Sequence, residues 1–223
     1  MAAVSSVMNQ ISPVPGAASS PSRPPTRRTL AKQQTRLKVL TAGRRLFSEE
    51  GYEGATIRDI ATAAGMSTGA VFANFADKAD LFREIMTSDM IELQAAMRDA
   101  APKGHDVEDA VLRAYMAGYE FYEPRLQLAR AALSVSWDRE GGQALRSVAG
   151  AISFPSVFEE ILTAAEGRGE LVKNTDIGLL ARMLYEIYLS NFRQAIFERW
   201  SLEALEARAR KQIHILLAGA RRG

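Results

Sequence analysis

The chain contains no cysteine and only two histidines, His105 and His214, among its 223 residues. Without thiols it forms no disulfide, zinc finger or iron–sulfur cluster, and it has no thiol nucleophile. It also lacks any run approaching the ~20 apolar residues of a transmembrane helix, and its N-terminus has no compact apolar core of the signal-peptide type. We therefore expect a cytoplasmic protein without a membrane partner.

Signatures of catalysis are equally scarce. Neither histidine has a second histidine at helical spacing, and no H-E-x-x-H motif occurs. No phosphate-binding P-loop or dinucleotide-binding glycine motif is present, because Gly65 and Gly69 follow no strand. We expect a protein that is not an enzyme and that needs no metal or cofactor.

Acidic residues are absent from the first 48 positions, although the net charge of the whole chain is only +2. Eight basic residues lie in that stretch, and the remainder holds 20 basic against 26 acidic residues. The eight are Arg23, Arg27, Arg28, Lys32, Arg36, Lys38, Arg44 and Arg45. Positive charge concentrated in one region favours a nucleic-acid partner, because contacts with phosphates supply most non-specific affinity.

Five of the eight prolines lie before residue 26, among serine and alanine. Such a composition buries too little apolar surface to offset the entropy of ordering. We predict that residues 1–34 form a disordered, basic, proline-rich arm. From about residue 35 to 50, Leu37, Leu40, Leu46 and Phe47 predict a first helix that ends at Gly51.

Residues 56–82 read TIRDIATAAGMSTGAVFANFADKADLF and predict two short helices, a glycine turn between them and the start of a third helix. Thr56 and Asp59 fit a capping box, and Gly65 suits the turn because glycine readily adopts positive φ. Ser67 is the expected cap of the second helix, Thr68 to Phe75. This spacing is typical of a helix-turn-helix, whose second helix enters a DNA groove.

The motif resembles the DNA-binding signature of TetR/AcrR-type transcriptional regulators over roughly residues 35–82. The matching positions are Thr56, Arg58, Ile60, Ala61, Ala64, Gly65, Ser67, Gly69, Phe72, Phe75, Lys78 and Leu81. The resemblance implies DNA contacts by Arg44, Thr56, Arg58, Ser67, Thr68, Gly69, Ala70, Phe72, Asn74 and Lys78. Two positions depart from the family, which usually has tyrosine at Phe72 and commonly histidine at Asn74. Phe72 has no hydroxyl to donate to phosphate, whereas Asn74 keeps a polar side chain for phosphate or base edges.

Beyond residue 83, helical periodicity dominates and no convincing strand occurs, so the predicted fold is all-α. We expect about nine helices in total, in a three-helix head at 35–82 and a larger effector-binding and dimerisation body at 83–223. Asp77 is the expected N-cap of the helix that links head and body. The further predicted helices span 106–122, 125–137, 142–166 with a kink or split at Pro155, 175–199 and 202–220.

Aromatic residues are dense in the body, where ordinary core packing competes with a ligand cavity as their explanation. The resemblance implies a cavity for a small, largely apolar effector of unknown identity. The candidate lining residues are Tyr115, Tyr119, Tyr122, Trp137, Phe154, Phe158, Tyr185 and Tyr188, with Arg130, Glu186 and Asn191 as candidate polar partners.

The last two helices are apolar around much of their circumference, which favours two packing partners. One is the body itself and the other a second copy of the chain, in a two-fold four-helix interface; packing of both faces within one chain is the alternative. Candidate interface residues are Leu184, Ile187, Phe192, Ile196, Leu205, Ile213 and Leu216.

These features together predict a homodimeric transcriptional repressor that binds a palindromic double-stranded operator and is released by its effector. Within the cytoplasm it would associate with the nucleoid. The alternative is a helical protein-interaction module that has lost specific DNA binding, which the changes at Phe72 and Asn74 favour.

Overall fold

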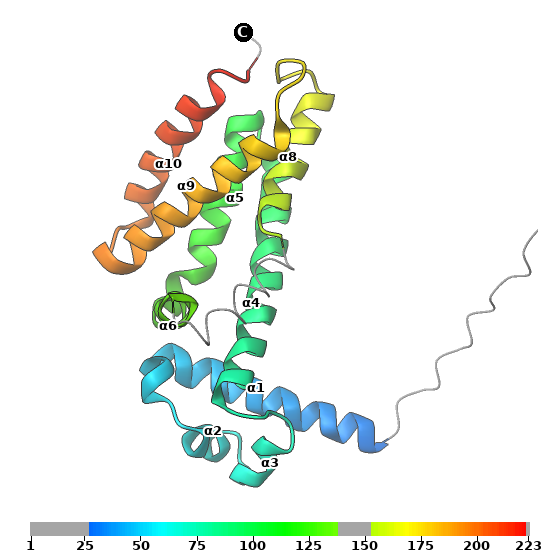
Figure 1. Cartoon of the computed structure of the whole chain (residues 1–223), viewed down its shortest axis with the longest axis vertical. Helices are drawn as coiled ribbons and strands as arrows, with labels where there is room; N and C mark the ends of the chain where they lie inside the picture. Colours follow the sequence, from blue (N-terminus) through cyan, green and yellow to red (C-terminus); the bar gives the residue numbers. More distant parts are fainter. Residues whose placement is uncertain (1–26, 138–152, 222–223) are drawn as a thin grey trace, which may run out of the picture.

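A computed structural model describes residues 27–137 and 153–221, and within them the chain is all-α, as predicted. Its helices run in the order α1 (Arg27–Gly54), α2 (Ile57–Ala63), α3 (Thr68–Phe72), α4 (Lys78–Ala100), η1 (Ala101–Lys103), α5 (Val107–Tyr122), η2 (Glu123–Arg125), α6 (Leu126–Trp137), α8 (Pro155–Gly167), α9 (Ile177–Glu198) and α10 (Leu202–Leu217). Figure 1 shows α1, α2 and α3 grouped at one end of an elongated molecule. None of the described helices is both long and apolar enough to cross a membrane.

The first helix begins earlier than the predicted boundary of the arm. Residues 27–34 belong to α1, since from Leu30 onward the sequence offers helix-forming residues and no proline. The predicted arm at residues 1–26 lies outside the described residues. Leu37, predicted to face the core, is 61% exposed, and Val39 and Ala42 are buried instead. The predicted end at Gly51 corresponds to a break within α1, where this glycine has φ 76°.

The head has a small core of its own built around three aromatic rings. Phe47 and Phe82 meet edge to face with centroids 5.1 Å apart, and Tyr52 lies 4.9 Å from Phe82. Ile60 from α2 and Val71 from α3 are fully buried in the same cluster. Both short helices are therefore fixed by their inward side chains rather than by their own length.

Two helices connect the head to the body. α4 starts beside α3 and continues into the body, so it crosses the boundary predicted at residue 82 (Figure 1). α6 lies against α1, and its Leu128 and Ala131 are buried in the head's core. The head is thus packed on the body through side chains of both helices.

The body's core is dominated by tyrosines. The rings of Tyr119 and Tyr188 stack 5.0 Å apart, and Tyr115 meets Tyr188 edge to face at 5.4 Å. Gly118 permits this approach, because a Cβ at its position would lie only 2.5 Å from the Tyr188 hydroxyl oxygen. Burial raises the pKa of Tyr115 and Tyr188 well above the usual range, so both side chains stay neutral.

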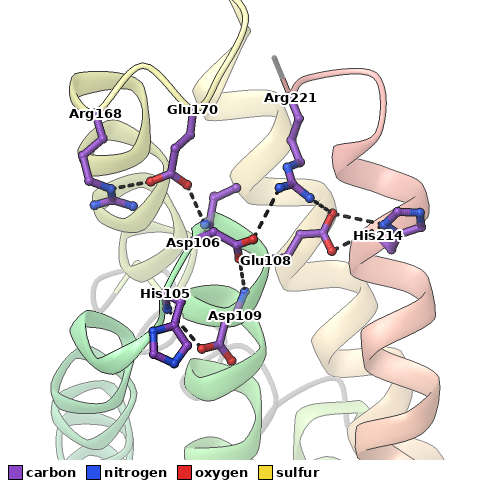
Figure 2. A network of polar contacts seen from close by, with 9 residues as sticks. His105, Asp106, Glu108, Asp109, Arg168, Glu170, His214 and Arg221 are labelled. Atoms are coloured by element: carbon purple, nitrogen blue, oxygen red, sulfur yellow. Dashed lines mark hydrogen bonds and ion pairs between the residues drawn. The ribbon is translucent and has the colours of Figure 1, made fainter. Parts of the chain in front are cut away.

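Polar contacts close the end of the body remote from the head (Figure 2). Glu108 of α5 accepts a hydrogen bond from Arg221 at 2.5 Å and lies 3.2 Å from His214 of α10. Glu170 accepts from the backbone N–H of Val107 at 2.7 Å. An isolated antiparallel bridge between Leu171 and Arg221 completes the closure. The start of α5 is therefore tied to the end of α10 and to Arg221 beyond it.

The remaining helices lie near their predicted ranges. α8 begins at Pro155, at the predicted kink or split, because proline is accommodated in the first turn of a helix. Residues 142–152 of that prediction lie outside the described residues. α3 ends at Phe72 rather than Phe75, although the amides of Asn74 and Phe75 both donate to the Val71 carbonyl.

Candidate nucleic-acid interface and ligand cavity

Side-chain caps set the geometry of the helix-turn-helix. Thr56 accepts from the Asp59 amide at 3.2 Å and donates its hydroxyl to the Asp59 carboxylate at 2.5 Å. Gly65 forms the turn with φ 69°, and Ser67 accepts from the Ala70 amide at 3.3 Å. The sequence predicted each of these features, because each depends on residues only two or three positions apart.

The recognition segment after the turn has one face in the core and one in solvent. Val71 and Phe75 are 0% and 2% exposed, and they anchor α3 to the head. Thr68, Gly69 and Phe72 are exposed, whereas Ala70 is half-buried. Among the other candidate contacts, Thr56, Arg58 and Ser67 are also exposed. The described head thus presents an outer surface with little charge on α3 itself.

A cation that sequence reasoning placed on the outside holds α3 in position. The guanidinium of Arg36 lies 4.5 Å from the centroid of the Phe75 ring and donates to the Asn74 carbonyl at 2.8 Å. It also donates to Glu84 of α4 at 2.9 Å. α1 and α4 are therefore both tied to the end of the recognition segment. No local pattern signals this role, since Arg36 and Glu84 are distant in sequence.

A cavity of about 400 Å³ lies in the body next to α6. Its walls come from α5, η2, α6, the end of α9 and the start of α10. The lining residues are Tyr119, Glu123, Leu126, Gln127, Arg130, Phe192, Ala195, Arg199, Trp200, Leu202 and Leu205. Arg130 is held by two hydrogen bonds to the Ile196 carbonyl, at 3.2 and 2.7 Å. The cavity wall is thus mainly apolar and aromatic, with Arg130 and Arg199 as cationic residues and Glu123 as an anionic one.

Most of the aromatic residues predicted to line a ligand site instead pack against one another. Tyr115, Tyr122, Phe154, Phe158 and Tyr188 are buried in the core and do not line this cavity. Tyr185 is half-buried and stacks on Phe154 at 5.7 Å, while Tyr119 alone of the predicted set contributes to the cavity wall among the described residues. The side chain of Trp137 lies outside the described residues.

The candidate polar partners are likewise separated. Arg130 lines the cavity, Asn191 is buried and donates to Gln212 at 2.8 Å, and Glu186 is exposed. Periodicity identified which residues face inward, but not which inward residues leave a void between them. The described residues contain no group of three or more histidine, cysteine, aspartate or glutamate side chains suited to a metal ion.

Comparison with known proteins agrees with this architecture. Residues 39–85 match the model of the bacterial regulatory proteins of the tetR family. The transcriptional repressor AcnR of Corynebacterium glutamicum is 35% identical over 103 residues, which cover 43% of this chain and 50% of that protein. Residues 39–85 therefore form a DNA-binding head of the TetR type.

Solved structures share the fold beyond the head. A TetR-family transcriptional regulator of Mesorhizobium loti superposes with a TM-score of 0.72 over 88% of this chain and 100% of its own, at 20% identity. FadR of Bacillus subtilis, solved with stearoyl-CoA, superposes with a TM-score of 0.66 over 82% of this chain and 98% of its own, at 17% identity. At sequence identities of 20% and 17%, these superpositions show that the fold is shared and nothing more. The sequence match to AcnR spans half of that relative's length.

Asn74 does not present its side chain as the family resemblance implies. Its Nδ2 donates to the Ala70 carbonyl at 2.9 Å, so the amide is turned back onto its own segment. The amide nitrogen is thus already engaged, and the expected base or phosphate contact of Asn74 stays a prediction. The cause is local, because a short polar side chain beyond the end of a helix readily bonds a carbonyl four residues earlier.

Arg44, a predicted DNA contact, is paired within the protein, and its contact with DNA stays a prediction. Its guanidinium faces α4, where it lies 2.6 Å from the fully buried carboxylate of Asp89. Burial raises the pKa of Asp89, while the charges of Arg44 and Arg125 act in the opposite direction. Arg44 offsets the cost of a buried charge at the junction between head and body, a role visible only once α1 and α4 are packed.

Lys78 is half-buried and bound within the head. Its Nζ donates to the Tyr52 carbonyl at 2.9 Å, approaches that of Ala55 at 3.4 Å, and lies 4.3 Å from the centroid of the Tyr52 ring. An ammonium group has three donors, so one remains for a phosphate. The expected phosphate contact of Lys78 stays a prediction.

The predicted dimer residues are mostly core residues of a single chain. Leu184, Ile196, Leu205 and Ile213 are at most 2% exposed and Phe192 is 9% exposed, so none of them offers a surface to a partner. Ile187 and Leu216 are half-buried. The large exposed apolar residues of α9 and α10 are Leu179, Met183, Phe197 and Ile215, at 55%, 44%, 64% and 74% exposure. Periodicity found the apolar helices but did not separate the inner from the outer stripe.

Proposed function

We propose that this chain is a sequence-specific DNA-binding transcriptional repressor of the TetR type, released from its operator by a small, largely apolar effector. The observation that carries the proposal is the capped α2–turn–α3 unit, which holds Thr68, Gly69 and Phe72 outward on a helix anchored by Val71 and Phe75. Small outward residues allow the close approach that a major groove requires.

Phosphate contacts would come from the surroundings of α3. Arg58 and Ser67 are exposed donors beside it, Thr56 is exposed with its hydroxyl donated to Asp59, and the start of α1 is basic. These groups are suited to set orientation and general affinity, while the α3 side chains supply sequence preference. The expected affinity therefore falls steeply as salt increases.

A homodimer follows from the outer stripe of α9 and α10. Leu179, Met183, Phe197 and Ile215 expose large apolar side chains on adjacent helices, a surface suited to a self-complementary four-helix contact. Two heads related by a two-fold axis would read two half-sites, and paired major grooves on one face of DNA are about 34–36 Å apart. A palindromic operator is the corresponding partner.

The cavity beside α6 is the candidate effector site. One side of α6 lines the cavity with Leu126, Gln127 and Arg130, and another side packs Leu128 and Ala131 into the head. A ligand that fits the cavity only when α6 is displaced would favour head positions unsuited to the operator. Such a ligand shifts the equilibrium between the two head positions by the difference in its binding free energy for them.

The chemistry of the wall supports an effector with an aromatic or aliphatic body. Tyr119, Phe192 and Trp200 give flat apolar surfaces, and Arg130 and Arg199 give cationic groups. FadR, of the same fold, was solved with stearoyl-CoA, so acyl compounds are reasonable first members of a screen.

Selection of bound genomic fragments by the purified protein, at two salt concentrations and including DNA upstream of its own reading frame, tests DNA recognition. A palindromic site with groove-spaced halves supports the proposal. A folded dimer that enriches no sequence contradicts it.

A filled cavity tests the effector site. Ala195→Phe places a large side chain in the cavity wall, whereas Ala95→Phe adds the same bulk at an exposed position of α4. We expect the first variant to bind the operator yet fail to release it when a screened effector is added. If the effector released operator DNA from Ala195→Phe as it does from wild type, the effector site would lie outside this cavity.

The alternative is a helical protein-interaction module without specific DNA binding. The inward-turned amide of Asn74 and the missing hydroxyl at Phe72 favour it. The same selection separates the two functions, because the module would enrich no operator.

A further inference from the structure

The outer face of the recognition segment is almost devoid of hydrogen-bonding side chains. From Thr68 to Ala76, the exposed residues are Thr68, Gly69, Phe72, Ala73 and Ala76. Arginine, lysine, asparagine and glutamine, the residues that pair with guanine and adenine edges, are missing from this exposed set. Asn74, the one amide of the segment, bonds the Ala70 carbonyl. Recognition of a base by this face must rest largely on apolar contact.

Phe72 is the large side chain on this face. It is 54% exposed, and it belongs to neither of the hydrophobic clusters formed by the described residues. A single exposed aromatic residue elsewhere on a surface would need no explanation. Here it stands one residue beyond the buried Val71, on the segment that the proposed function brings to DNA.

The side chain is held outward by its neighbours. Val71 and Phe75 fix the segment from the inside, and Ser67 caps its start. Arg36 covers the Phe75 ring at 4.5 Å and holds the Asn74 carbonyl at 2.8 Å. With both ends of the segment tied, the position of the Phe72 Cβ is set before any DNA is bound.

We propose that Phe72 reads the C5 methyl group of a thymine in each half-site of the operator. The inference rests on the proposed DNA-binding function and adds a specificity-determining residue to it. The thymine methyl is the one apolar group that the four base pairs present in the major groove. Phenylalanine against any other edge would cover a donor or acceptor without bonding it, which is unfavourable.

Deoxyuridine provides the sharpest test, because it lacks only the C5 methyl and keeps every hydrogen-bonding group of thymine. Each thymine of the selected operator is replaced in turn, and the dissociation constants of wild type and Phe72→Ala are measured by fluorescence anisotropy. Loss of one buried methyl group corresponds to about a 4-fold weaker complex, and loss in both half-sites to about 15-fold. We expect that loss at one thymine per half-site for wild type, and none there for Phe72→Ala, because the partner of the methyl is already gone.

Two variants control the reading. Phe72→Tyr keeps the ring and should keep the sensitivity to deoxyuridine, whereas Ile91→Ala removes an exposed apolar side chain from α4 and should leave the wild-type pattern unchanged. An unchanged midpoint of urea unfolding for Phe72→Ala is expected, since the side chain is exposed.

Two results would overturn the inference. One is wild-type binding that is insensitive to every thymine replacement, which would place Phe72 against the sugar–phosphate backbone or in solvent. The other is an equal loss for wild type and Phe72→Ala at each position. Both leave DNA recognition intact, whereas failure to select any operator contradicts the proposed function itself.

Discussion

Aromatic side chains are packed differently in the head and in the body of this chain. In the head, the rings of Phe47, Tyr52 and Phe82 meet in a small core that also holds Phe75, and the ring of Phe72 is exposed to solvent. In the body, the tyrosines pack against one another in a buried cluster. The cavity lies at the edge of that cluster, beside α6. An aromatic residue therefore signals a surface for binding only where its neighbours leave it uncovered.

The two regions also differ in how they are joined. The head completes its core with Leu128 and Ala131 of α6, and Arg44 of α1 compensates the buried Asp89 of α4. The body needs no side chain from the head for its tyrosine cluster. Variants in the head should therefore affect both stability and DNA binding, whereas variants in the body should affect them separately.

The largest effect is expected when a core ring is removed. Phe82→Ala should lower the free energy of unfolding by about 4 kcal/mol, since the ring is 1% exposed, and abolish operator binding. Phe158→Ala, also fully buried but in the body, should cost a similar amount while the folded fraction still binds DNA. Urea unfolding and anisotropy titration measure both. Equal loss of binding per folded molecule in the two variants would remove the distinction between the regions.

A smaller effect is expected at the junction. Arg44→Ala leaves the Asp89 carboxylate buried without its closest cation and should cost about 3 kcal/mol at pH 7. Because the pKa of Asp89 is already raised in the folded state, its contribution to stability is complete below its unfolded pKa of about 3.9 and is lost as the pH rises through the folded pKa. Without Arg44 that loss should be steeper.

Urea unfolding of wild type and Arg44→Ala between pH 4.5 and 8 gives the measurement. Adding Asp89→Asn to Arg44→Ala should flatten the extra pH dependence, because the titrating group is gone. Parallel stability curves for wild type and Arg44→Ala would exclude Asp89 as the group that Arg44 compensates.

Variants of the proposed dimer surface on α9 and α10 should give a moderate effect. Ile215 is 74% exposed, so Ile215→Glu should leave the fold of one chain intact yet weaken dimerisation by about 30-fold, or about 2 kcal/mol. Ile91→Glu places the same charge at a comparably exposed isoleucine of α4 and should not change assembly. Sedimentation over a range of concentrations compares them. If Ile91→Glu alone dissociates the dimer, the interface lies on α4.

The smallest effect concerns Lys78. If its remaining donor meets a phosphate, Lys78→Ala should reduce the slope of log affinity against log salt by about 1 and weaken all sequences alike. Lys103→Ala removes an equal charge from the body and should leave the slope unchanged. Should Lys78→Ala lower only the unfolding free energy, the lysine acts solely by holding the Tyr52 and Ala55 carbonyls.

What could be predicted from the sequence depends on how far apart in the chain the interacting residues are. The capped turns at Thr56, Ser67 and Asp77 and the positive φ of Gly65 were predictable, since each depends on neighbouring residues. The all-α fold and most helix limits followed from periodicity.

Features that depend on distant residues were not predictable. The pairing of Arg44 with Asp89, the support of Phe75 by Arg36, and the burial of Leu184 and Ile196 arise when helices far apart in sequence meet. The location of the cavity was not predictable either. It depends on the space left between Tyr119 of α5 and the residues Ala195 and Trp200, which lie far from it in the sequence.

The proposal that a dimer binds two half-sites through its two heads is tested most directly by the dependence of DNA affinity on half-site spacing. Fluorescence anisotropy would compare the selected operator, a scrambled duplex, and the operator with about five extra base pairs between its halves, which rotate one half-site by half a turn. The account predicts at least a 1,000-fold preference, roughly, for the operator over the scrambled duplex, most of it lost on insertion. Equal affinity for all three duplexes would contradict it.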